Sequence, residues 1–151
     1  VDHLSGVVSM RIIRKLCDNC KVAYTPHPKL LQQLGLPAGR VAELYQPFVY
    51  KPGMLDEEES PIVPCHKCSG IGFRGRTGIF EFLTVTDQLK SAIQQKPQLA
   101  HLQAVAQQGG TIQSGGETVT VPPHVSMKLE GVLMIAKGLT SVDELQRVLK
   151  G

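Results

Sequence analysis

Apolar residues in two stretches of the chain follow the pattern of β-strands. Residues 9–16 and 76–83 carry apolar side chains on both faces, which is typical of strands covered from two sides. Glu81 is the polar exception in the second stretch. Residues 2–16 also fit a helical stripe in part, so we expect a short helix that passes into a strand near Ser9.

In the C-terminal half of the chain, the spacing of apolar residues changes to that of helices. Thr86 is expected to cap a first helix, and Pro97 to open a second helix that ends at Gly109. The residues expected to face inward are Leu89, Ala92 and Ile93 in the first helix, and Leu99, Leu102, Val105 and Ala106 in the second.

A β-hairpin and two further helices are expected after these. The hairpin spans 111–121, with its turn at Ser114-Gly115-Gly116. Ser141 and Glu144 form a capping box at the start of the last helix, in which the serine oxygen and the glutamate carboxylate each accept a backbone N–H. The residues expected to face inward are Val125, Leu129, Val132, Leu133 and Ala136 in the third helix, and Val142, Leu145, Val148 and Leu149 in the last.

Residues 21–64 contain seven prolines, and few regular elements are expected there. Lys29 to Leu34 fit a short helix, and residues 38–45 fit another. Asp56 to Glu59 form an acidic run, which we expect in a solvated surface loop.

The composition is that of a globular protein, since 42% of the 151 residues are hydrophobic and 19% are charged. No apolar run reaches the roughly 18–20 residues of a membrane span, and no signal segment opens the chain. The net charge of +3 is too small to indicate nucleic-acid binding by itself. Because the chain begins at Val1 and not at Met, we expect it to be part of a longer protein.

The four cysteines form two pairs, Cys17-x-x-Cys20 and Cys65-x-x-Cys68. Two such turns supply four sulfurs in tetrahedral positions, which suits a structural Zn²⁺ with no open coordination position. The 44 residues between the pairs exceed the usual roughly 15–20 of a compact zinc ribbon, which calls for an inserted subdomain. Two disulfides and a redox dithiol remain alternatives. With four cysteines available, His66 is expected to be an exposed spacer.

Motifs that carry catalysis are absent from the sequence. It contains no GxxxxGK[ST] phosphate loop, HExxH or GxSxG. Gly75-Arg76-Thr77-Gly78 is followed by a strand and lacks the lysine of a phosphate loop. We therefore expect Arg76 to pair with a carboxylate, either Glu81 or one outside this chain.

Three segments, RIIRKLCDNCK, CHKCSGIGFRGRTGIFEFL and LEGVLMIAKGLTSVDELQRVL, resemble in this order the C-terminal part of the assembly ATPases of type II secretion and type IV pili. These are the secretion ATPase E and pilus assembly ATPase B types. The resemblance implies that Cys17, Cys20, Cys65 and Cys68 are zinc ligands. It also implies structural or interdomain roles for Arg11, Arg14, Arg76 and Glu81, and no catalytic residue here.

The resemblance implies an α+β fold, mainly helical, in which a tetracysteine zinc subdomain is inserted between two antiparallel strands and is followed by a C-terminal helical bundle. Residues 1–16 would end the RecA-like ATPase domain, 17–72 would form the zinc subdomain, 73–84 would return as a strand, and 85–151 would form the helical subdomain. Closure of the metal site brings the adjoining ends of the two strands together, so we expect residues 9–16 and 76–83 to pair.

In this family the phosphate loop and the acidic residues that bind ATP and Mg²⁺ lie upstream, so this chain by itself is not expected to hydrolyse ATP. The implied partners are the remainder of the ATPase, neighbouring subunits of a hexamer and the inner-membrane platform proteins of a secretion or pilus machine, with no nucleic acid. The implied location is cytoplasmic, peripheral to the bacterial inner membrane. The chain departs from the family at Met10, where glutamine is usual, in its longer segment between the cysteine pairs and in the hairpin at 111–121.

Two alternatives from other classes remain at this point. CHKCSGIG also resembles one zinc repeat of the DnaJ chaperone, although only one of the two cysteine pairs here has the glycines. A zinc-ribbon nucleic-acid-binding module is the other, with a basic face from Arg11, Arg14, Lys15, Lys21, Lys67, Arg74 and Arg76. In the ATPase interpretation, the chain is a docking and assembly part, and residues 46–64 are its candidate contact surface.

Overall fold

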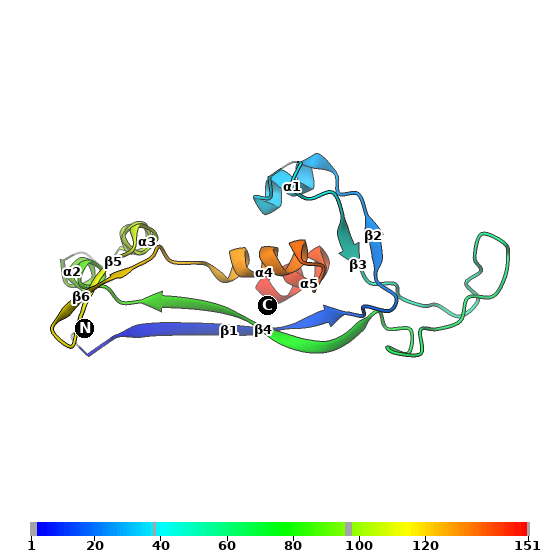
Figure 1. The fold of residues 1–151 in the computed structure, drawn as a ribbon, viewed down its shortest axis with the longest axis horizontal. Coiled ribbons are helices and arrows are strands. Elements are labelled where there is room, and N and C mark those ends of the chain that lie inside the picture. The colour runs from blue at the N-terminus through cyan, green and yellow to red at the C-terminus, as the bar shows by residue number, and fades with distance from the viewer. Residues whose placement is uncertain (1–2, 38, 96–97, 151) are drawn as a thin grey trace. The chain divides into compact units, whose positions relative to one another are not determined.

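A computed structural model describes residues 3–37, 39–95 and 98–150. The described residues form an α+β structure in which each sheet has two strands (Figure 1). The strands are β1 (Gly6–Leu16), β2 (Val22–Tyr24), β3 (Leu44–Gln46), β4 (Phe73–Thr84), β5 (Gly110–Ser114) and β6 (Glu117–Val121). The helices are α1 (Pro28–Leu34), α2 (Asp87–Gln95), α3 (Leu99–Gln108), α4 (Met127–Ala136) and α5 (Val142–Lys150).

Contacts divide the chain into two compact units. The first comprises Val1–Met10 and Phe80–Met127, and the second comprises Arg11–Ile79 and Lys128–Gly151. Strands β1 and β4 contribute residues to both units. Among the described residues, every helix is too short or too polar to span a lipid bilayer.

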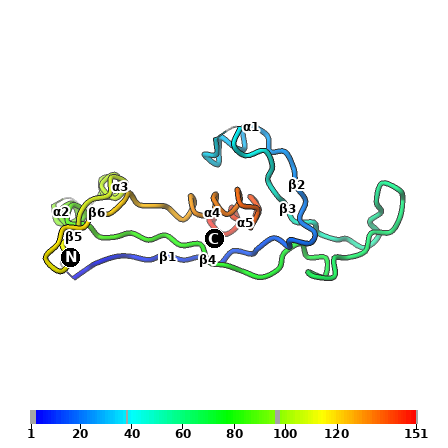
Figure 2. Tube along the Cα trace, in the orientation of Figure 1, coloured from blue at the N-terminus to red at the C-terminus, as the bar shows by residue number. Residues whose placement is uncertain are grey.

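Strand β1 pairs with β4, and the two run side by side along the backbone trace (Figure 2). Val85 donates its N–H to the carbonyl of Ser5 at 3.0 Å, and Cys17 donates to the carbonyl of Gly72 at 3.0 Å. Because these bonds join the beginning of each strand to the end of the other, the pair is antiparallel, as the sequence predicted for residues 9–16 and 76–83. This ladder ends at the first cysteine.

The short helix expected before Ser9 is wrong, because β1 already begins at Gly6. Hydrogen bonds to the distant strand β4 satisfy the backbone of this segment, and periodicity within the segment cannot reveal them. Gly6 lies close to β4, since a Cβ atom there would come within 3.3 Å of the carbonyl oxygen of Leu83.

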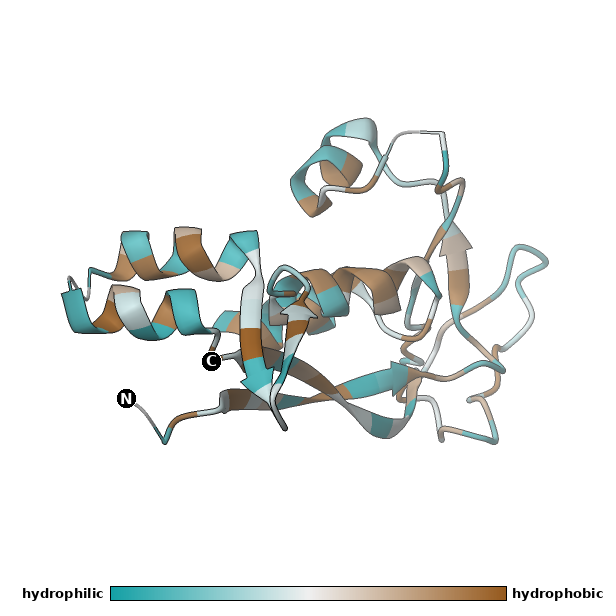
Figure 3. Cartoon of the chain, turned by 60° about the vertical axis from the view of Figure 1, so that its left-hand side comes forward, coloured by the Kyte–Doolittle hydropathy of each residue, from teal (hydrophilic) through white to brown (hydrophobic). Residues whose placement is uncertain are grey.

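The first unit contains α2, α3 and the β5–β6 hairpin, which confirms the hairpin predicted at 111–121. Thr86 caps α2 as predicted, and its Oγ1 accepts the N–H of Leu89 at 3.2 Å. In α3, Leu99 does not face inward, because 72% of its surface is exposed. Pro97 lies outside the described residues. Hydrophobic and hydrophilic residues alternate along the helices (Figure 3), as expected for elements with one solvated face.

The second unit has its core where β1, β3, β4, α4 and α5 contribute fully buried side chains, among them Ile13, Leu44, Ile79 and Ile135. The predicted face of α4 is wrong in part, because Leu129 and Leu133 are each 48% exposed. Val132, which was correctly expected to face inward, is buried together with Ile135. The predicted inward position of Val125, before α4, is also wrong, since this residue is exposed.

Close packing of α5 explains the orientation of α4 in the second unit. Gly131 of α4 is buried, and a Cβ atom added there would collide with the side chain of Leu145 in α5. A glycine lets two helices approach each other closely, so the side of α4 that bears Gly131 is the one that faces α5. The spacing of apolar residues along the sequence does not reveal that this helix contact requires a glycine.

The segment between the cysteine pairs contains one of its two predicted helices. Helix α1 forms as predicted and buries Leu31. The helix predicted for 38–45 is wrong, because β3 begins at Leu44 and pairs with β2 in the register Tyr24↔Leu44. Pairing with β2 determines the strand, and Leu44 is fully buried there. Ala38 lies outside the described residues.

Candidate metal centre

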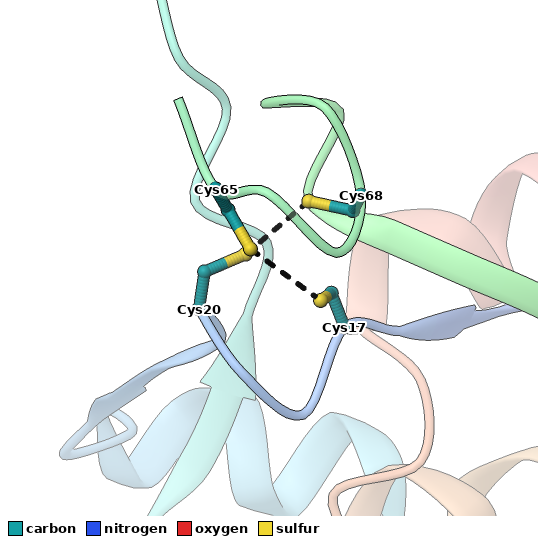
Figure 4. A group of neighbouring side chains, drawn as sticks. All are labelled: Cys17, Cys20, Cys65 and Cys68. Atoms are coloured by element: carbon teal, nitrogen blue, oxygen red, sulfur yellow. Dashed lines mark hydrogen bonds between the residues drawn. The ribbon is translucent and has the colours of Figure 1, made fainter. Parts of the chain in front are cut away.

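The ends of β1 and β4 bring the four cysteines together, as Figure 4 shows. Cys17 and Cys20 follow β1, and Cys65 and Cys68 precede β4. All four Sγ atoms lie within 4.8 Å of one another. The distances are 4.0 Å between Cys17 and Cys65 and 3.5 Å between Cys20 and Cys68. Tetrahedral sulfur ligands at about 2.3 Å from a zinc ion would be about 3.8 Å apart, so the observed spacing fits such an ion.

The disulfide alternative is wrong in this structure, because all four cysteines are free thiols. Their sulfur atoms are far beyond the roughly 2.05 Å of a disulfide bond. One compact group of four sulfurs, two from each CxxC turn, matches the ligand set of a closed structural site. The side chain of His66 is exposed, as expected for a spacer.

Backbone hydrogen bonds shape the first cysteine turn, residues 17–21, which we call the first knuckle. The N–H groups of Cys20 and Lys21 both donate to the carbonyl of Cys17, at 3.1 and 2.9 Å. The resulting tight turn directs both thiols of the CxxC pair to one point. From within the turn, the side-chain amide of Asn19 donates to Sγ of Cys65 at 3.4 Å and so connects the two cysteine pairs.

The second cysteine turn, residues 65–72, depends on its glycines and forms the second knuckle. Gly72 donates its N–H to Sγ of Cys68 at 3.3 Å, which ties the end of the turn to this sulfur. Gly70 and Gly72 have φ angles of 79° and 81°, in the region that favours glycine. A Cβ atom on Gly70 would lie 2.8 Å from Tyr50, and one on Gly72 would lie 2.7 Å from Pro47. Both glycines therefore let the preceding segment pack on the knuckle.

The environment of the thiols differs within the group. Burial, the largest effect on Cys65, raises its pKa, but hydrogen bonds from the backbone at Cys68 and Lys67 and from Asn19 together lower this pKa to about 6. Burial, again the largest effect, raises the pKa of Cys20, and its sulfur neighbours raise it further. Cys65 is therefore prepared for deprotonation, whereas Cys20 needs a nearby cation to become a thiolate.

Of the four residues that the resemblance assigned to structural or interdomain roles, Arg14 has the most contacts. Its guanidinium donates to the carboxylate of Glu144, with Nη2 at 2.6 Å from Oε2, and lies 4.2 Å from the ring centroid of Phe73. Arg147 donates to the same carboxylate from Nε and Nη2, at 2.9 and 2.7 Å. Burial, the largest effect, raises the pKa of Glu144, but the bonds from Arg147 and Arg14 outweigh it and lower this pKa to about 2.

The capping box predicted at the start of α5 is therefore only half correct. Ser141 Oγ accepts the N–H of Glu144 at 3.3 Å, but the Glu144 carboxylate binds Arg14 and Arg147 and not the serine backbone. Sequence reasoning missed this role of Glu144, since its partner Arg14 lies 130 positions away. An acidic residue at the third helical position is also an ordinary capping signal.

The suggested pairing of Arg76 with Glu81 is wrong. Glu81 accepts the N–H of Met127 at 3.0 Å and lies 3.3 Å from Nε2 of His124. It thereby connects β4 to the beginning of α4 within the first unit. Arg76 is exposed and lines a hollow with Ile12, Arg14 and Arg147. Arg11 is exposed as well.

Known proteins are similar to this chain over nearly its whole length. It is 29% identical over 142 residues to the type IV pilus assembly ATPase PilB of Thermus thermophilus, covering 94% of this chain and 13% of that protein. It is also 29% identical over 147 residues to the type II secretion system protein E of Dickeya dadantii and to the type II secretion system ATPase E of Vibrio cholerae. Those matches cover 97% of this chain but 23% and 24% of the two proteins.

The chain thus spans between 13% and 24% of the length of these relatives. The family described as type II/IV secretion system protein matches residues 1–145 of the 151. This match takes in both cysteine pairs, both strands that adjoin them and most of the helices that follow. The chain belongs to the type II/IV secretion system protein family.

Proposed function

We propose that this chain is the C-terminal part of a secretion or pilus assembly ATPase, and that it serves as a structural and docking module of that motor. The match to the family over residues 1–145 is the observation that carries this proposal, and it favours the motor over a chaperone or nucleic-acid module. The relatives PilB and secretion ATPase E are named as ATPases. The parent protein is therefore expected to hydrolyse ATP in a domain that lies upstream of these residues.

The cysteine group is proposed to hold one structural Zn²⁺. The ion would crosslink Cys17, Cys20, Cys65 and Cys68 and thereby fix the ends of β1 and β4 beside each other. On this view residues 17–72 form a subdomain inserted between the two strands, and residues 85–151 form the helical subdomain. A closed set of four thiolates leaves no position for a substrate, so the ion supplies rigidity and no catalysis.

The contact surface that we propose for docking is the segment 46–64, which we call the arm. The N–H of Tyr50 donates to the carbonyl of Gly70 at 2.9 Å, which ties the base of the arm to the second knuckle. Farther out, Ile62 donates to Met54 at 3.0 Å, and the two sides of the arm run antiparallel. Its tip, residues 56–59, is acidic and exposed. The arm thus projects carboxylates from a base that the metal would hold.

The exposed apolar residues of the first unit fit a chain that normally packs against the rest of a larger protein. In β1, 61% of the surface of Val8 and 53% of that of Met10 are exposed. Phe82 of β4 is also exposed. A folded protein rarely leaves a contiguous apolar face uncovered. We propose that the remainder of the ATPase, or a neighbouring subunit of a hexamer, covers this face.

The proposed partners are the other parts of the motor and the inner-membrane platform proteins of a secretion or pilus machine, and the proposed location is the cytoplasmic side of the inner membrane. Deletion of residues 53–61 from the intact parent protein tests the docking role. Filament assembly or secretion should fall at least several-fold, while the zinc content stays at one equivalent. Normal assembly by this variant would exclude the arm as the contact surface.

The metal proposal has a separate test in the intact parent protein. Purified without chelator, it should contain about one zinc per chain, and Cys65→Ser should lower this content to a small fraction. The matched control is His66→Ala, the exposed neighbour of Cys65, which should keep the full content. A zinc content below half an equivalent in the unmodified protein would refute the metal site.

A further inference from the structure

The loop between α4 and α5 is bound to both ends of the first knuckle. Leu16, directly before Cys17, donates its N–H to the carbonyl of Leu139 at 2.9 Å. Lys21, directly after Cys20, donates from Nζ to the carbonyl of Gly138 at 3.1 Å. The residues that flank the CxxC pair thus hold two consecutive carbonyl groups of the same loop.

Lys21 is held in this position by further contacts. Its Nζ lies 2.7 Å from Oδ1 of Asp18 and 5.0 Å from the ring centroid of Tyr45 in β3. Tyr45 also packs on Gly138, because a Cβ atom there would come within 2.8 Å of the ring. The side chain of Lys21 is 21% exposed, so most of it is withdrawn from water. The ammonium group is therefore held against the Gly138 carbonyl and does not move freely in water.

The carbonyl group that Lys21 binds lies at the C-terminal end of α4. Gly138, with φ of 66°, donates its N–H to Ile135, and Leu139 donates to Met134. A cation at this end of a helix is favourable, since the free carbonyl groups carry partial negative charge. On the other side of the loop, Thr140 is buried, and its hydroxyl donates to the carbonyl of Arg14 at 2.9 Å.

We propose that Lys21 is a positioning residue that couples the metal centre to the helices α4 and α5. This inference rests on the proposed metal site. A bound ion would fix the backbone between Cys17 and Cys20, and with it the two donors, Leu16 and Lys21, that hold the loop. Loss of the ion frees this short turn, and the α4–α5 loop then loses both contacts. The metal centre therefore determines how firmly the C-terminal helices are held.

Hydrogen exchange by mass spectrometry on the intact parent protein tests this coupling. It is measured for the unmodified protein and for Lys21→Met, each zinc-loaded and after treatment with a chelator, with the zinc content determined in every sample. Lys90→Met is the matched control, since this lysine of α2 also has an acidic neighbour three positions away but belongs to the first unit, whereas the loop belongs to the second. Lys21→Arg keeps the charge and serves as a second variant.

Chelation of the unmodified protein should raise the exchange rates of the α5 amides, residues 142–150, about ten-fold or more, the scale of a lost hydrogen bond to a charged group. With zinc still bound, Lys21→Met should raise the same rates, chelation should then add little, and Lys21→Arg should lie between the two. Lys90→Met should respond as the unmodified protein does.

Two results would overturn the coupling while the zinc site stands. The α5 rates could stay within two-fold on chelation although residues 17–22 exchange faster. Alternatively, Lys21→Met could keep the α5 rates of the unmodified protein while zinc is bound and then show the full increase on chelation. A preparation that holds no zinc before chelation would instead refute the metal site, and the coupling with it. The zinc determination distinguishes these two failures.

Discussion

Arg14 and Glu144 form an ion pair across 130 positions of sequence, with Nη2 of the arginine 2.6 Å from Oε2 of the glutamate. The backbone N–H of Arg14 donates to Oε1 of the same carboxylate at 3.1 Å. Because the Glu144 side chain has no exposed surface, these bonds replace the water that an ionised carboxylate would otherwise bind. The pair joins β1 to α5 inside the second unit.

Replacement of Glu144 by glutamine should destabilise the protein by about 2–3 kcal/mol. The change removes a buried charge that accepts bonds from two arginines, and truncation of one partner of such a pair typically costs about 3–5 kcal/mol. We place the effect at or just below the bottom of this range, since both arginines are partly exposed and can regain water. Urea unfolding would measure it, with the exposed neighbour variant Asp143→Asn as control. An effect below 0.5 kcal/mol would contradict the role of the pair.

Protonation of the Glu144 carboxylate should make the free energy of unfolding depend on pH in the acidic range. The pKa of Glu144 is about 2 in the folded protein, below its usual value of 4.5. A lowered folded-state pKa gives stability that is present above the unfolded value and is lost as the pH falls through the folded value. The loss should lie between about pH 4.5 and 2 and amount to roughly 3 kcal/mol.

Urea unfolding at a series of pH values, for the unmodified protein and Glu144→Gln, isolates this contribution. The difference in unfolding free energy between the two should be largest above pH 4.5 and should shrink steadily as the pH falls toward 2. Metal loss in acid affects both proteins and cancels in the difference. A difference that does not change with pH would show that the contacts with the two arginines do not lower the pKa of Glu144.

In the metal-free protein, Cys65 should be alkylated before Cys20. The pKa of Cys65 is lowered to about 6, whereas burial raises the pKa of Cys20, so Cys65 and not Cys20 is largely thiolate at neutral pH. Iodoacetamide labelling followed by peptide mass spectrometry should give a rate for Cys65 that rises with a midpoint near pH 6. Asn19→Leu removes one bond to this sulfur and should move the midpoint upward. Equal rates at all four cysteines would contradict this assignment.

Replacement of Gly131 by alanine should destabilise the protein by about 1–3 kcal/mol, although alanine is the better helix former by about 1 kcal/mol. The added methyl group would collide with Leu145 of the neighbouring helix. The compensating variant Leu145→Val, combined with Gly131→Ala, should recover part of the loss. Thermal or urea unfolding of the two single variants and the double variant measures this coupling. A purely additive result would show that the two side chains do not compete for space.

The sequence alone determined the features that depend on neighbouring residues. The spacing within each CxxC pair predicted that the four cysteines meet, and the four thiols do gather at one point. The cap at Thr86, the hairpin at 111–121 and the pairing of the segments that adjoin the cysteines were also predicted correctly. In each case, the chemistry of a turn or a metal ligand is contained in a few adjacent positions.

Tertiary structure decided what depends on partners that are distant in sequence. Strand β1 begins at Gly6 because β4 supplies its hydrogen bonds, and β3 replaces a predicted helix because β2 lies beside it. The local sequence predicts that Glu144 caps its own helix, but in the fold it binds Arg14. A buried carboxylate is stable only when a cation lies beside it, and this cation comes from a distant part of the chain. The orientation of α4 follows from the space at Gly131, which only the approach of α5 defines. Local patterns fix the turns, the cap at Thr86 and the hairpin, whereas the extent of the strands, the faces of the helices and the ion pairs are fixed by contacts that form only when the chain has folded.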